Sequence, residues 1–471
     1  MSADDIFQKA NVAAAVFSQY SQEQVDAIVR AVYKAGFDNR VRLAKMAVEE
    51  TKLGRWQDKV IKNVLATQIV YEDIKDDKTV GIISDDKITG ILEIAQPIGP
   101  ILAITPVTNP TSTAMFKIII ALKTRNPIII SPHRNAEKCT MEAARVCYEA
   151  ALSADAPEDC IQWVTHTSRE ETQKLMSHKS LALILATGGS GLVRAAYSSG
   201  TPAIGVGSGN VPVLIEKSAD AQFAVSQILA SKTFDNGTVC CSEQAIVAEQ
   251  AIAGDVIAEF SRHKAYFLED GEIPKLERVA FDREKGIMNA AIIGKPAGEI
   301  LKLAGLNAPP DTSVIIARLK GVGANHPLSS EILAPILAFY TAPSFDDAVN
   351  LCIEINFHGG MGHTASMYSN DEEKIRKFAN LMNAGRILIN TPSSQGGVGG
   401  FYNTLSPSLT LGCGTGGKNI TTDNITARHL LNIQRIARRR VNDTFASFDH
   451  AKYYDESFNA ERLEKEYCRN R

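Results

Sequence analysis

Two adjacent cysteines, Cys240 and Cys241, follow a turn in the stretch FDNGTVCCSEQ, which lies between two apolar segments. A cysteine is a strong nucleophile when its thiolate is accessible, and it is inert when it is packed in hydrocarbon. A cysteine at the start of a strand is more often a small core residue. Here the preceding Asn236-Gly237 favours a tight, exposed turn, and the polar loops described below favour a nucleophile at this position.

Asn109 is a second group that could take part in the same chemistry. It lies in ITPVTNPTS, directly before a predicted helix. An amide side chain there can donate to an oxyanion that develops during attack on a carbonyl, a contact often worth a few kcal/mol in the transition state. The alternative interpretation is an ordinary turn or helix-capping asparagine, which Asn109 alone would favour.

A glycine-rich strand-to-helix turn, LATGGSGLVRAA, offers a different kind of site. The backbone N–H groups of such a turn suit a phosphate. The pattern reads G-x-G-x-x-R and not G-x-G-x-x-G, so it is a weak dinucleotide signal. Structural turn glycines are an equally good interpretation of this stretch alone.

Alternating strands and helices must position these loops. Short, nearly all-apolar strands alternate with helices between residues 101 and 206, and a second such series begins near Val211. This pattern predicts parallel sheets covered by helices on both faces, an α/β fold. Ligands of such sheets gather at the carboxyl ends of strands, so we expect the functional groups in loops that follow strands, the cysteine turn included.

The first 80 residues predict helices, and the pattern then changes to a period of two. Residues 79–98 alternate apolar and polar side chains around the turn DDK, which predicts a β-hairpin. An exposed strand with an apolar edge needs a partner. We therefore expect the hairpin to pair with another part of the structure or with another subunit.

Composition excludes several other classes of function. The 471 residues carry a net charge of −3, with 45% hydrophobic residues, so neither nucleic acid nor an anionic membrane is expected as a partner. The N-terminus has acids where a signal peptide needs a basic region, and the apolar runs are too short to span a bilayer. The eight cysteines lack metal-ligand spacing, so we expect free thiols, no metal and a cytoplasmic protein.

A spaced series of motifs runs through the chain from about residue 20 to 435: NPTSTAMFKIIIALKTRNPIIISPH, ILATGG, AAYSSGTPAIGVGSGN, FDNGTVCCSEQ, GMGHTASMYSN and PSLTLGCGTGGKNI. Together these motifs resemble the aldehyde dehydrogenase superfamily. The resemblance is greatest to its CoA-acylating branch, which includes the dehydrogenase half of bifunctional aldehyde–alcohol dehydrogenases and stand-alone enzymes for acetaldehyde, sulfoacetaldehyde and succinate semialdehyde. No alcohol dehydrogenase half follows, so we expect a stand-alone enzyme.

The resemblance implies the aldehyde dehydrogenase fold, with two Rossmann-like α/β domains and a β-hairpin oligomerisation arm. Residues 1–80 and 99–210 would form the dinucleotide-binding domain and residues 211–405 the catalytic domain. Residues 81–98 and 406–425 would form the arm of a homodimer or homotetramer. Residues 426–471 would be a C-terminal helix and polar tail.

The resemblance also assigns catalytic roles. Cys240 would attack the aldehyde to give a thiohemiacetal and then a thioester, with Cys241 as a bystander. Asn109 and the Cys240 backbone N–H would form the oxyanion hole. His363, in GMGHTAS, would handle the thiol proton or contact CoA, although a structural histidine is nearly as good an interpretation.

Binding of NAD or NADP is implied in the same way. Glu331, in SSEILAPI, is similar to the family's glutamate that holds the nicotinamide ribose. Arg134 could pair with a 2′-phosphate, which favours acceptance of NADP while leaving NAD open. The other implied cofactor-binding residues are Thr105, Pro106, Thr108, Ser131, His133, Thr187, Gly188, Gly189, Ser190 and Gly207.

One departure from the wider family points to CoA. Val206 stands where hydrolytic relatives carry the glutamate that activates water. Without that base the thioester should persist until a thiol attacks it, which gives aldehyde + CoA + NAD(P)+ ⇌ acyl-CoA + NAD(P)H. The NPTSTAM stretch resembles the acetaldehyde-type enzymes more than the succinate-semialdehyde type, which implies acetaldehyde, with sulfoacetaldehyde and succinate semialdehyde as alternatives. An acyl-phosphate reductase of the same fold and a catalytically silent scaffold or filament subunit are further alternatives.

Overall fold

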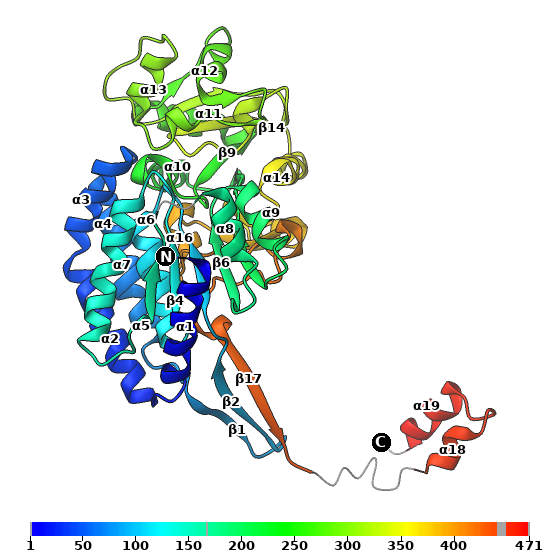
Figure 1. Cartoon of the computed structure of the whole chain (residues 1–471). Coiled ribbons are helices and arrows are strands. Elements are labelled where there is room, and N and C mark those ends of the chain that lie inside the picture. Colours follow the sequence, from blue (N-terminus) through cyan, green and yellow to red (C-terminus); the bar gives the residue numbers. More distant parts are fainter. Residues whose placement is uncertain (1, 166–167, 440–448, 470–471) are drawn as a thin grey trace.

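The structure is a computed structural model that describes residues 2–165, 168–439 and 449–469. Two parallel sheets covered by helices form the body, and a narrow antiparallel sheet projects from it (Figure 1). The predicted α/β class is confirmed.

The first sheet consists of five parallel strands, and alternate residues along each strand enter opposite cores. In the central strand, Ile101 and Ala103 face one core, whereas Leu102 faces the other. The strand order is β5 (Ile161–Trp163), β4 (Ile128–Ser131), β3 (Ile101–Ile104), β6 (Leu183–Thr187) and β7 (Ala203–Val206). One face packs on α2 (Gln22–Asp38), α6 (Pro110–Lys123) and α7 (Glu137–Leu152), and the other on α1 (Ala3–Phe17), α8 (Arg169–Met176) and α9 (Ser190–Tyr197).

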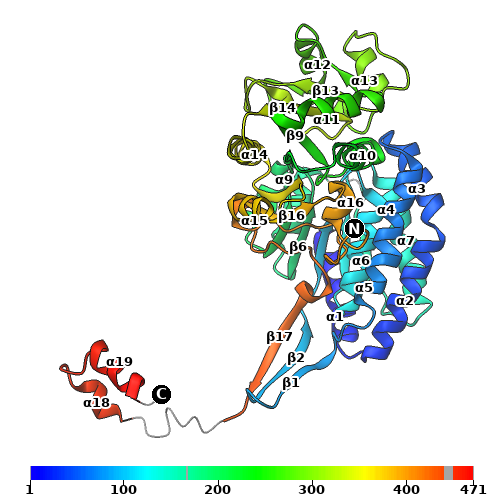
Figure 2. The same cartoon turned by 180° about the vertical axis from the view of Figure 1, so that it is seen from behind.

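Three further N-terminal helices pack beside α2 and α6 (Figure 2). They are α3 (Arg40–Thr51), α4 (Trp56–Val64) and α5 (Val70–Ile74), with a π-helical turn, η1 (Leu65–Ile69), between α4 and α5. Helix α4 differs from an ordinary surface helix because the side chains that it buries include Lys59, Lys62 and Asn63. These polar groups need partners inside the protein.

The second sheet has seven parallel strands. Their order is β10 (Tyr266–Phe267), β13 (Ile315–Arg318), β14 (Ile336–Ala342), β9 (Glu243–Glu249), β8 (Val211–Ile215), β15 (Gly362–Tyr368) and β16 (Ala384–Ile389). Helices α10 (Ala221–Lys232) and α11 (Gln250–Arg262) cover one face, and α14 (Phe345–Gly359) and α15 (Glu372–Leu381) cover the other. Smaller elements complete this half: α12 (Ile273–Ala280), α13 (Ala297–Leu303), the pair β11 (Phe281–Asp282) and β12 (Ile287–Met288), and α16 (Ser393–Val398).

The projecting sheet corrects one part of the predicted arm. The expected hairpin is present as β1 (Gly81–Asp86) and β2 (Ile91–Pro97), but the strand expected within 406–425 is wrong. The third strand is β17 (Leu431–Ala437), which pairs with β2 along its whole length. Residues 406–425 instead hold a single bridge, between Leu411 and Asn424, and a short 3₁₀ helix, η5 (Thr415–Gly417), because this glycine-rich segment packs against β15.

The C-terminal segment predicted as a helix and polar tail therefore contains an arm strand, which follows a short 3₁₀ helix, η6 (Ala427–Leu430). Two short helices follow, α18 (His450–Tyr454) and α19 (Ala460–Arg469), and Figure 1 shows them apart from the body. Residues 440–448 and 470–471 of the predicted tail lie outside the described residues. Among the residues that are described, no helix is long and apolar enough to cross a membrane.

A buried asparagine fixes the base of the arm. The Oδ1 atom of Asn126 accepts from the backbone N–H groups of Ile98 and Gly99 at 2.8 and 2.9 Å. Its Nδ2 atom donates to the carbonyl of Leu430 at 2.8 Å and to Thr124 Oγ1 at 2.7 Å. One side chain thus joins the end of β2, the start of β17 and the loop after α6.

Replacing Asn126 with Ala should destabilise the protein, because two N–H groups and one carbonyl would lose their partner in a buried place. We expect a cost of about 3 kcal/mol and a melting temperature lower by about 3–6 °C. The control is Asn432→Ala, since Asn432 is exposed and contacts Pro97 O only at 3.5 Å. Equal shifts in differential scanning fluorimetry for the two variants would contradict the role of Asn126.

Candidate active site

A four-residue loop joins the two sheets. Strand β7 ends at Val206 and β8 begins at Val211, so residues 207–210 connect the carboxyl edge of the first sheet to the amino edge of the second. Cys240 precedes β9 and therefore lies on that amino edge. The expectation that the cysteine turn lies at a carboxyl edge is wrong, because α10 and the turn after it return the chain to the start of β9.

The cysteine turn is tight, but it is buried rather than exposed. Asp235, Asn236 and Gly237 have φ values of 49°, 52° and 75°, three consecutive left-handed residues. A Cβ atom on Gly237 would lie 2.8 Å from the carbonyl oxygen of Ala334, so only glycine fits at this point. The sharp bend carries the chain from α10 to Cys240.

The carboxylate of Asp235 stabilises this unusual backbone. It is fully buried and accepts from Lys59 Nζ at 2.9 Å, from Lys62 Nζ at 2.5 Å and from the backbone N–H of Arg55 at 2.7 Å. Burial alone would raise its pKa, but the ammonium groups of Lys62 and Lys59 hold the pKa of Asp235 below its usual value. The group is thus an ionised anchor between α4 and the cysteine turn.

Lys62 also reaches the amide of Asn109. Its Nζ atom lies 2.6 Å from Asn109 Oδ1 and 3.0 Å from Thr238 Oγ1. Burial lowers the pKa of Lys62 to about 8, although Asp235 opposes the shift. The Nδ2 atom of Asn109 points to the cysteine turn and makes only long contacts, 3.3 Å to Thr108 Oγ1 and 3.5 Å to Thr238 O.

Cys240 is half-buried, and its surroundings favour a thiolate. The neighbouring Cys241 thiol, and then the His363 side chain and the Arg386 guanidinium, lower the pKa of Cys240 well below that of a free thiol, against the opposing effect of burial. Cys241 is fully buried, and its contact with Cys240 raises its own pKa. The residue interpreted above as a bystander thus helps to set the ionisation of its neighbour.

Gly209 brings Cys240 and His363 together. A Cβ atom at this position would lie 2.4 Å from the Cys240 carbonyl oxygen and 3.1 Å from the His363 ring. His363 is fully buried, with Nδ1 2.9 Å from Thr364 Oγ1. Its Nε2 atom has no partner among the described residues, so this nitrogen is available to a ligand or a transferred proton.

Glu331 lies against the same loop. Its Oε1 atom accepts from the backbone N–H of Gly209 at 3.0 Å, and burial raises the pKa of its carboxyl group to about 8. Val206, in contrast, packs in an apolar cluster with Val239 and Cys241. The side chain at position 206 is therefore an aliphatic group in a cluster of apolar and cysteine side chains, and it carries no group that could accept a proton.

Arg386, on β16, is a buried cation that the sequence did not reveal. Its guanidinium donates to the carbonyls of His363 and Gly412 at 2.6 and 2.7 Å and to Asn424 Oδ1 at 3.1 Å. Within the described part of the chain it forms no ion pair with a carboxylate. It fixes the backbone of His363 and supplies positive charge near Cys240.

Apart from Glu331, which precedes β14 of the second sheet, the predicted cofactor-binding residues lie along the carboxyl edge of the first sheet. Three groups there suit a dinucleotide: the buried Thr105 hydroxyl has no partner among the described residues, and the space where Cβ atoms of Gly189 and Gly207 would lie is open. The N-terminus of α9 follows Gly189 and offers backbone N–H groups. These features fit a phosphate-bearing cofactor.

The remaining residues of this edge are spread over several strands. Three of them, Thr105, Pro106 and Thr108, follow β3. Strand β4 ends at Ser131 and is followed by His133 and Arg134. Strand β6 ends at Thr187 and is followed by Gly188, Gly189 and Ser190, and Gly207 follows β7. Three strand spacings separate β4 from β7, about 14 Å, so only an extended ligand reaches both. Arg134 is exposed, and burial together with Arg134 lowers the pKa of His133.

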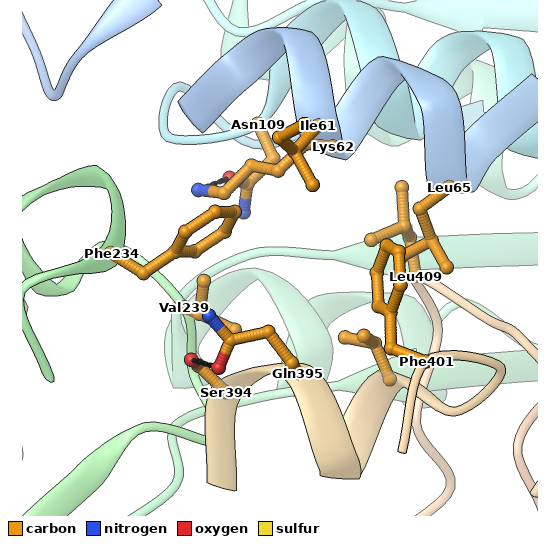
Figure 3. A pocket seen from close by; sticks show the side chains of 11 residues that line it. Ile61, Lys62, Leu65, Asn109, Phe234, Val239, Ser394, Gln395, Phe401 and Leu409 are labelled. Carbon is orange, nitrogen blue, oxygen red and sulfur yellow. Dashed lines mark hydrogen bonds between the residues drawn. The ribbon is translucent and has the colours of Figure 1, made fainter. Parts of the chain in front are cut away.

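A small pocket opens between α4 and α16, beside the cysteine turn (Figure 3). Asn109 and Lys62 lie at one side of it, and Ser394 and Gln395 at the other. The rest of the lining is apolar and consists of Ile61, Leu65, Phe234, Val239, Val398, Phe401 and Leu409. The pocket suits a small uncharged group that reaches toward Asn109.

Comparison with known proteins agrees with this geometry. A model of the aldehyde dehydrogenase family matches residues 1–272. The chain belongs to the aldehyde dehydrogenase family. The bifunctional aldehyde-alcohol dehydrogenase AdhE of Escherichia coli (strain K12) is 45% identical over 442 residues, 93% of this chain and 49% of that protein. The chain thus spans about half the length of such relatives.

Two solved structures are similar over nearly their whole length. An acetylating aldehyde dehydrogenase from Geobacillus thermoglucosidasius is 45% identical with a TM-score of 0.91, covering 93% of this chain and 97% of that one. A Rhodopseudomonas palustris propionaldehyde dehydrogenase with bound CoA and an acylated cysteine is 28% identical with a TM-score of 0.82, again covering 93% and 97%.

The cysteines of this aldehyde dehydrogenase differ sharply in their surroundings. Burial raises the pKa of Cys147 and Cys160 to about 12 and that of Cys413 to about 11. Only Cys240 combines partial accessibility with a lowered pKa among the described thiols, and Cys468 is exposed. Selective reactivity of Cys240 follows.

Alkylation with iodoacetamide should reveal the ionisation of Cys240 directly. In a Cys468→Ser background, the labelling rate of the Cys240 peptide, measured by mass spectrometry, should change less than about 3-fold between pH 8.5 and 6.5. A peptide thiol in the same tube should slow about 50-fold, because its thiolate is lost below its pKa of about 8.5. A parallel decline at Cys240 would show that its pKa is not lowered.

Proposed function

We propose that this aldehyde dehydrogenase is CoA-acylating and converts a short, uncharged aldehyde with CoA and NAD(P)+ to acyl-CoA and NAD(P)H. The observation that carries the proposal is the environment of Cys240: a thiol with a lowered pKa stands beside Val206, with hydrocarbon where a water-activating carboxylate would be needed. The acyl group on sulfur is therefore protected from hydrolysis.

The first step forms a bond between Cys240 Sγ and the aldehyde carbon, and the carbonyl π electrons move to oxygen. The resulting oxyanion needs donors, which Asn109 Nδ2 and the Cys240 backbone N–H supply. Asn109 lines the pocket and Cys240 follows the lining residue Val239, and Asn109 Nδ2 makes only long contacts within the protein. Preorganised donors of this kind stabilise developing charge at little reorganisation cost.

A nicotinamide cofactor, when bound, would accept the hydride, and Cys240 would then hold the acyl group as a thioester. Residues 207–210 connect the first sheet, which carries the proposed cofactor-binding edge, to the second sheet, which carries Cys240. Glu331 accepts from the backbone N–H of Gly209 and so holds this loop in place. CoA then attacks the thioester carbon through its thiol, and Cys240 leaves as the thiolate. His363 Nε2 has no partner in the described structure, so it can take the thiol proton.

The aldehyde class follows from the pocket. Lys62 is the cation of its lining, and its three N–H groups already have partners in Asp235, Asn109 and Thr238. An aldehyde with a carboxylate or sulfonate would lose its hydration without gaining an ion pair there. A neutral two- or three-carbon aldehyde, with acetaldehyde first, is therefore favoured over succinate semialdehyde or sulfoacetaldehyde.

We extend the proposal to the cofactor and the assembly. Arg134 is exposed after the end of β4 and suits the 2′-phosphate of NADP, and no described residue at this edge of the sheet opposes NAD.

The arm presents two strand edges that pair with no other described strand, β1 and β17, with Ile82 and Ile436 exposed. Pairing of such an edge with a second copy would remove it from water, which supports a homodimer or a dimer of dimers.

Transient kinetics without CoA tests the reaction class. Acetaldehyde and NAD(P)+ should give a burst of one NAD(P)H per active site, followed by a rate below about 1% of that reached with CoA, because water is not activated. Cys240→Ala should give no burst. Steady turnover without CoA, with free acetate as product, contradicts the proposal, and turnover restored by phosphate instead of CoA supports the acyl-phosphate alternative.

An aldehyde panel tests the substrate class. With CoA and each of NAD and NADP, acetaldehyde and propionaldehyde should exceed succinate semialdehyde and sulfoacetaldehyde in kcat/KM by about 100-fold, or about 3 kcal/mol. The reason is the absence of a free cation in the pocket lining. Equal or better values for either anionic aldehyde contradict this assignment without affecting the reaction class.

A further inference from the structure

Lys62 occupies a position that the reaction scheme above does not use. Its ammonium group touches three segments at once: Asn109 before α6, Asp235 in the turn after α10, and Thr238 just before Cys240. Asn109 and Lys62 belong to the first half of the chain, whereas Asp235 and Thr238 belong to the second. The contact therefore joins the two halves at the site of bond formation.

We propose that Lys62 is a positioning residue that orients and polarises the Asn109 amide for the oxyanion. The inference rests on the oxyanion role of Asn109 in the proposed function and assigns to Lys62 a role that acts through Asn109 alone.

The orientation follows from hydrogen-bonding capacity. A lysine ammonium has three donors and no acceptor, so the atom that it contacts on Asn109 must be the amide oxygen, at 2.6 Å. The amide nitrogen is then forced to the opposite side, toward Thr238 O and the cysteine turn. Without Lys62 the amide could rotate by 180° and present its oxygen to the oxyanion, which would repel it.

The polarisation follows from charge. Lys62 faces Asp235 from the turn after α10, Lys59 and Asp58 from its own helix, and the Phe234 ring at 5.6 Å. Lys59 and Lys62 both bind the Asp235 carboxylate, and Asp58, the second carboxylate near Lys62, lies 3.6 Å from Arg55. A charged donor on the amide oxygen strengthens the amide N–H as a donor, so protonated Lys62 makes Asn109 a better ligand for an oxyanion.

A double-mutant cycle separates this role from simple packing. The readout is the rate of the NAD(P)H burst with acetaldehyde and without CoA, in the wild type, Lys62→Met, Asn109→Ala and the double variant. We expect Lys62→Met to slow the burst by a factor about 10-fold larger when Asn109 is present than in the Asn109→Ala background, where only the loss of the Asp235 ion pair remains. Equal factors in both backgrounds overturn the inference.

Failure of the underlying function gives a different result. If Asn109→Ala alone leaves the burst rate unchanged, Asn109 is not an oxyanion donor, and the proposed site fails together with the inference. If Asn109→Ala slows the burst and Lys62→Met adds its full factor to it, only the role of Lys62 fails.

A matched variant controls for loss of structure. Lys59 shares the Asp235 carboxylate but contacts Thr108 O in place of Asn109. Lys59→Met should slow the burst by the same factor whether or not Asn109 is present, because its effect passes through the fold of the turn. A Lys59→Met effect that depends on Asn109 as strongly as that of Lys62→Met would contradict a specific role for Lys62.

The pH dependence tests the inference in proteins that retain Lys62. Its pKa of about 8 means that the ammonium group is present below pH 8 and is lost as the pH rises through that value. The burst rate of the wild type should therefore fall between pH 8 and 9.5, where Cys240 is already a thiolate. This decline should be smaller in Asn109→Ala, where the carboxyl group of Glu331, whose pKa burial also raises to about 8, still titrates. A decline of equal size in the two proteins would overturn the inference.

Discussion

The ion pairs between Asp235 and two buried lysines hold the two halves of the active site together. Removing these charges from water is costly, and the cost is offset only because every contact is short and each atom has several partners. The carboxylate also accepts from a backbone N–H of the segment before α4. The left-handed turn that presents Cys240, the loop that carries Asn109 and helix α4 therefore share one anchor, and a shift in any of them disturbs the other two.

Around that anchor the site is positively charged where negative charge develops. Lys62 lies behind Asn109, and Arg386 lies behind His363, each held by carbonyl or amide oxygens in the interior. Arg386 has no carboxylate partner among the described residues, so its field is not cancelled locally. Glu331 accepts from the backbone N–H of Gly209, and burial raises the pKa of its carboxyl group to about 8, which disfavours its charge. Positive charge thus lies near Cys240 and Asn109, where the proposed thiolate and oxyanion would form.

The sequence predicted those parts of the molecule that local pattern determines. All-apolar runs predicted the strands because parallel strands are buried on both faces, and the loops after β3, β4, β6 and β7 were correctly placed after strands. Cys240 and Asn109 were chosen as candidates because they are polar or reactive groups next to turn residues, and His363 and Glu331 because they stand in motifs that resemble those of the family.

Lys59, Lys62 and Asp235 were missed because 173 residues separate Lys62 from Asp235, and a lysine on a helix is usually solvated. The three-residue spacing of Lys59 and Lys62 in WQDKVIKNV, which places both lysines on one face of the helix, was the available signal. The third arm strand was misplaced because pairing with β2 is a long-range choice, and glycine-rich 406–425 and alternating LNIQRIA both suited a strand.

The shared anchor also restricts how this site can change over evolutionary time. A single replacement of Lys59, Lys62 or Asp235 leaves an unpaired buried charge, whereas a joint replacement by well-packed apolar side chains can be neutral or even stabilising. Intermediates between such sequences are therefore less fit than either end point. The three positions are expected to drift as one unit, and a variant transplanted from a distant homologue should function only when all three residues are carried over together.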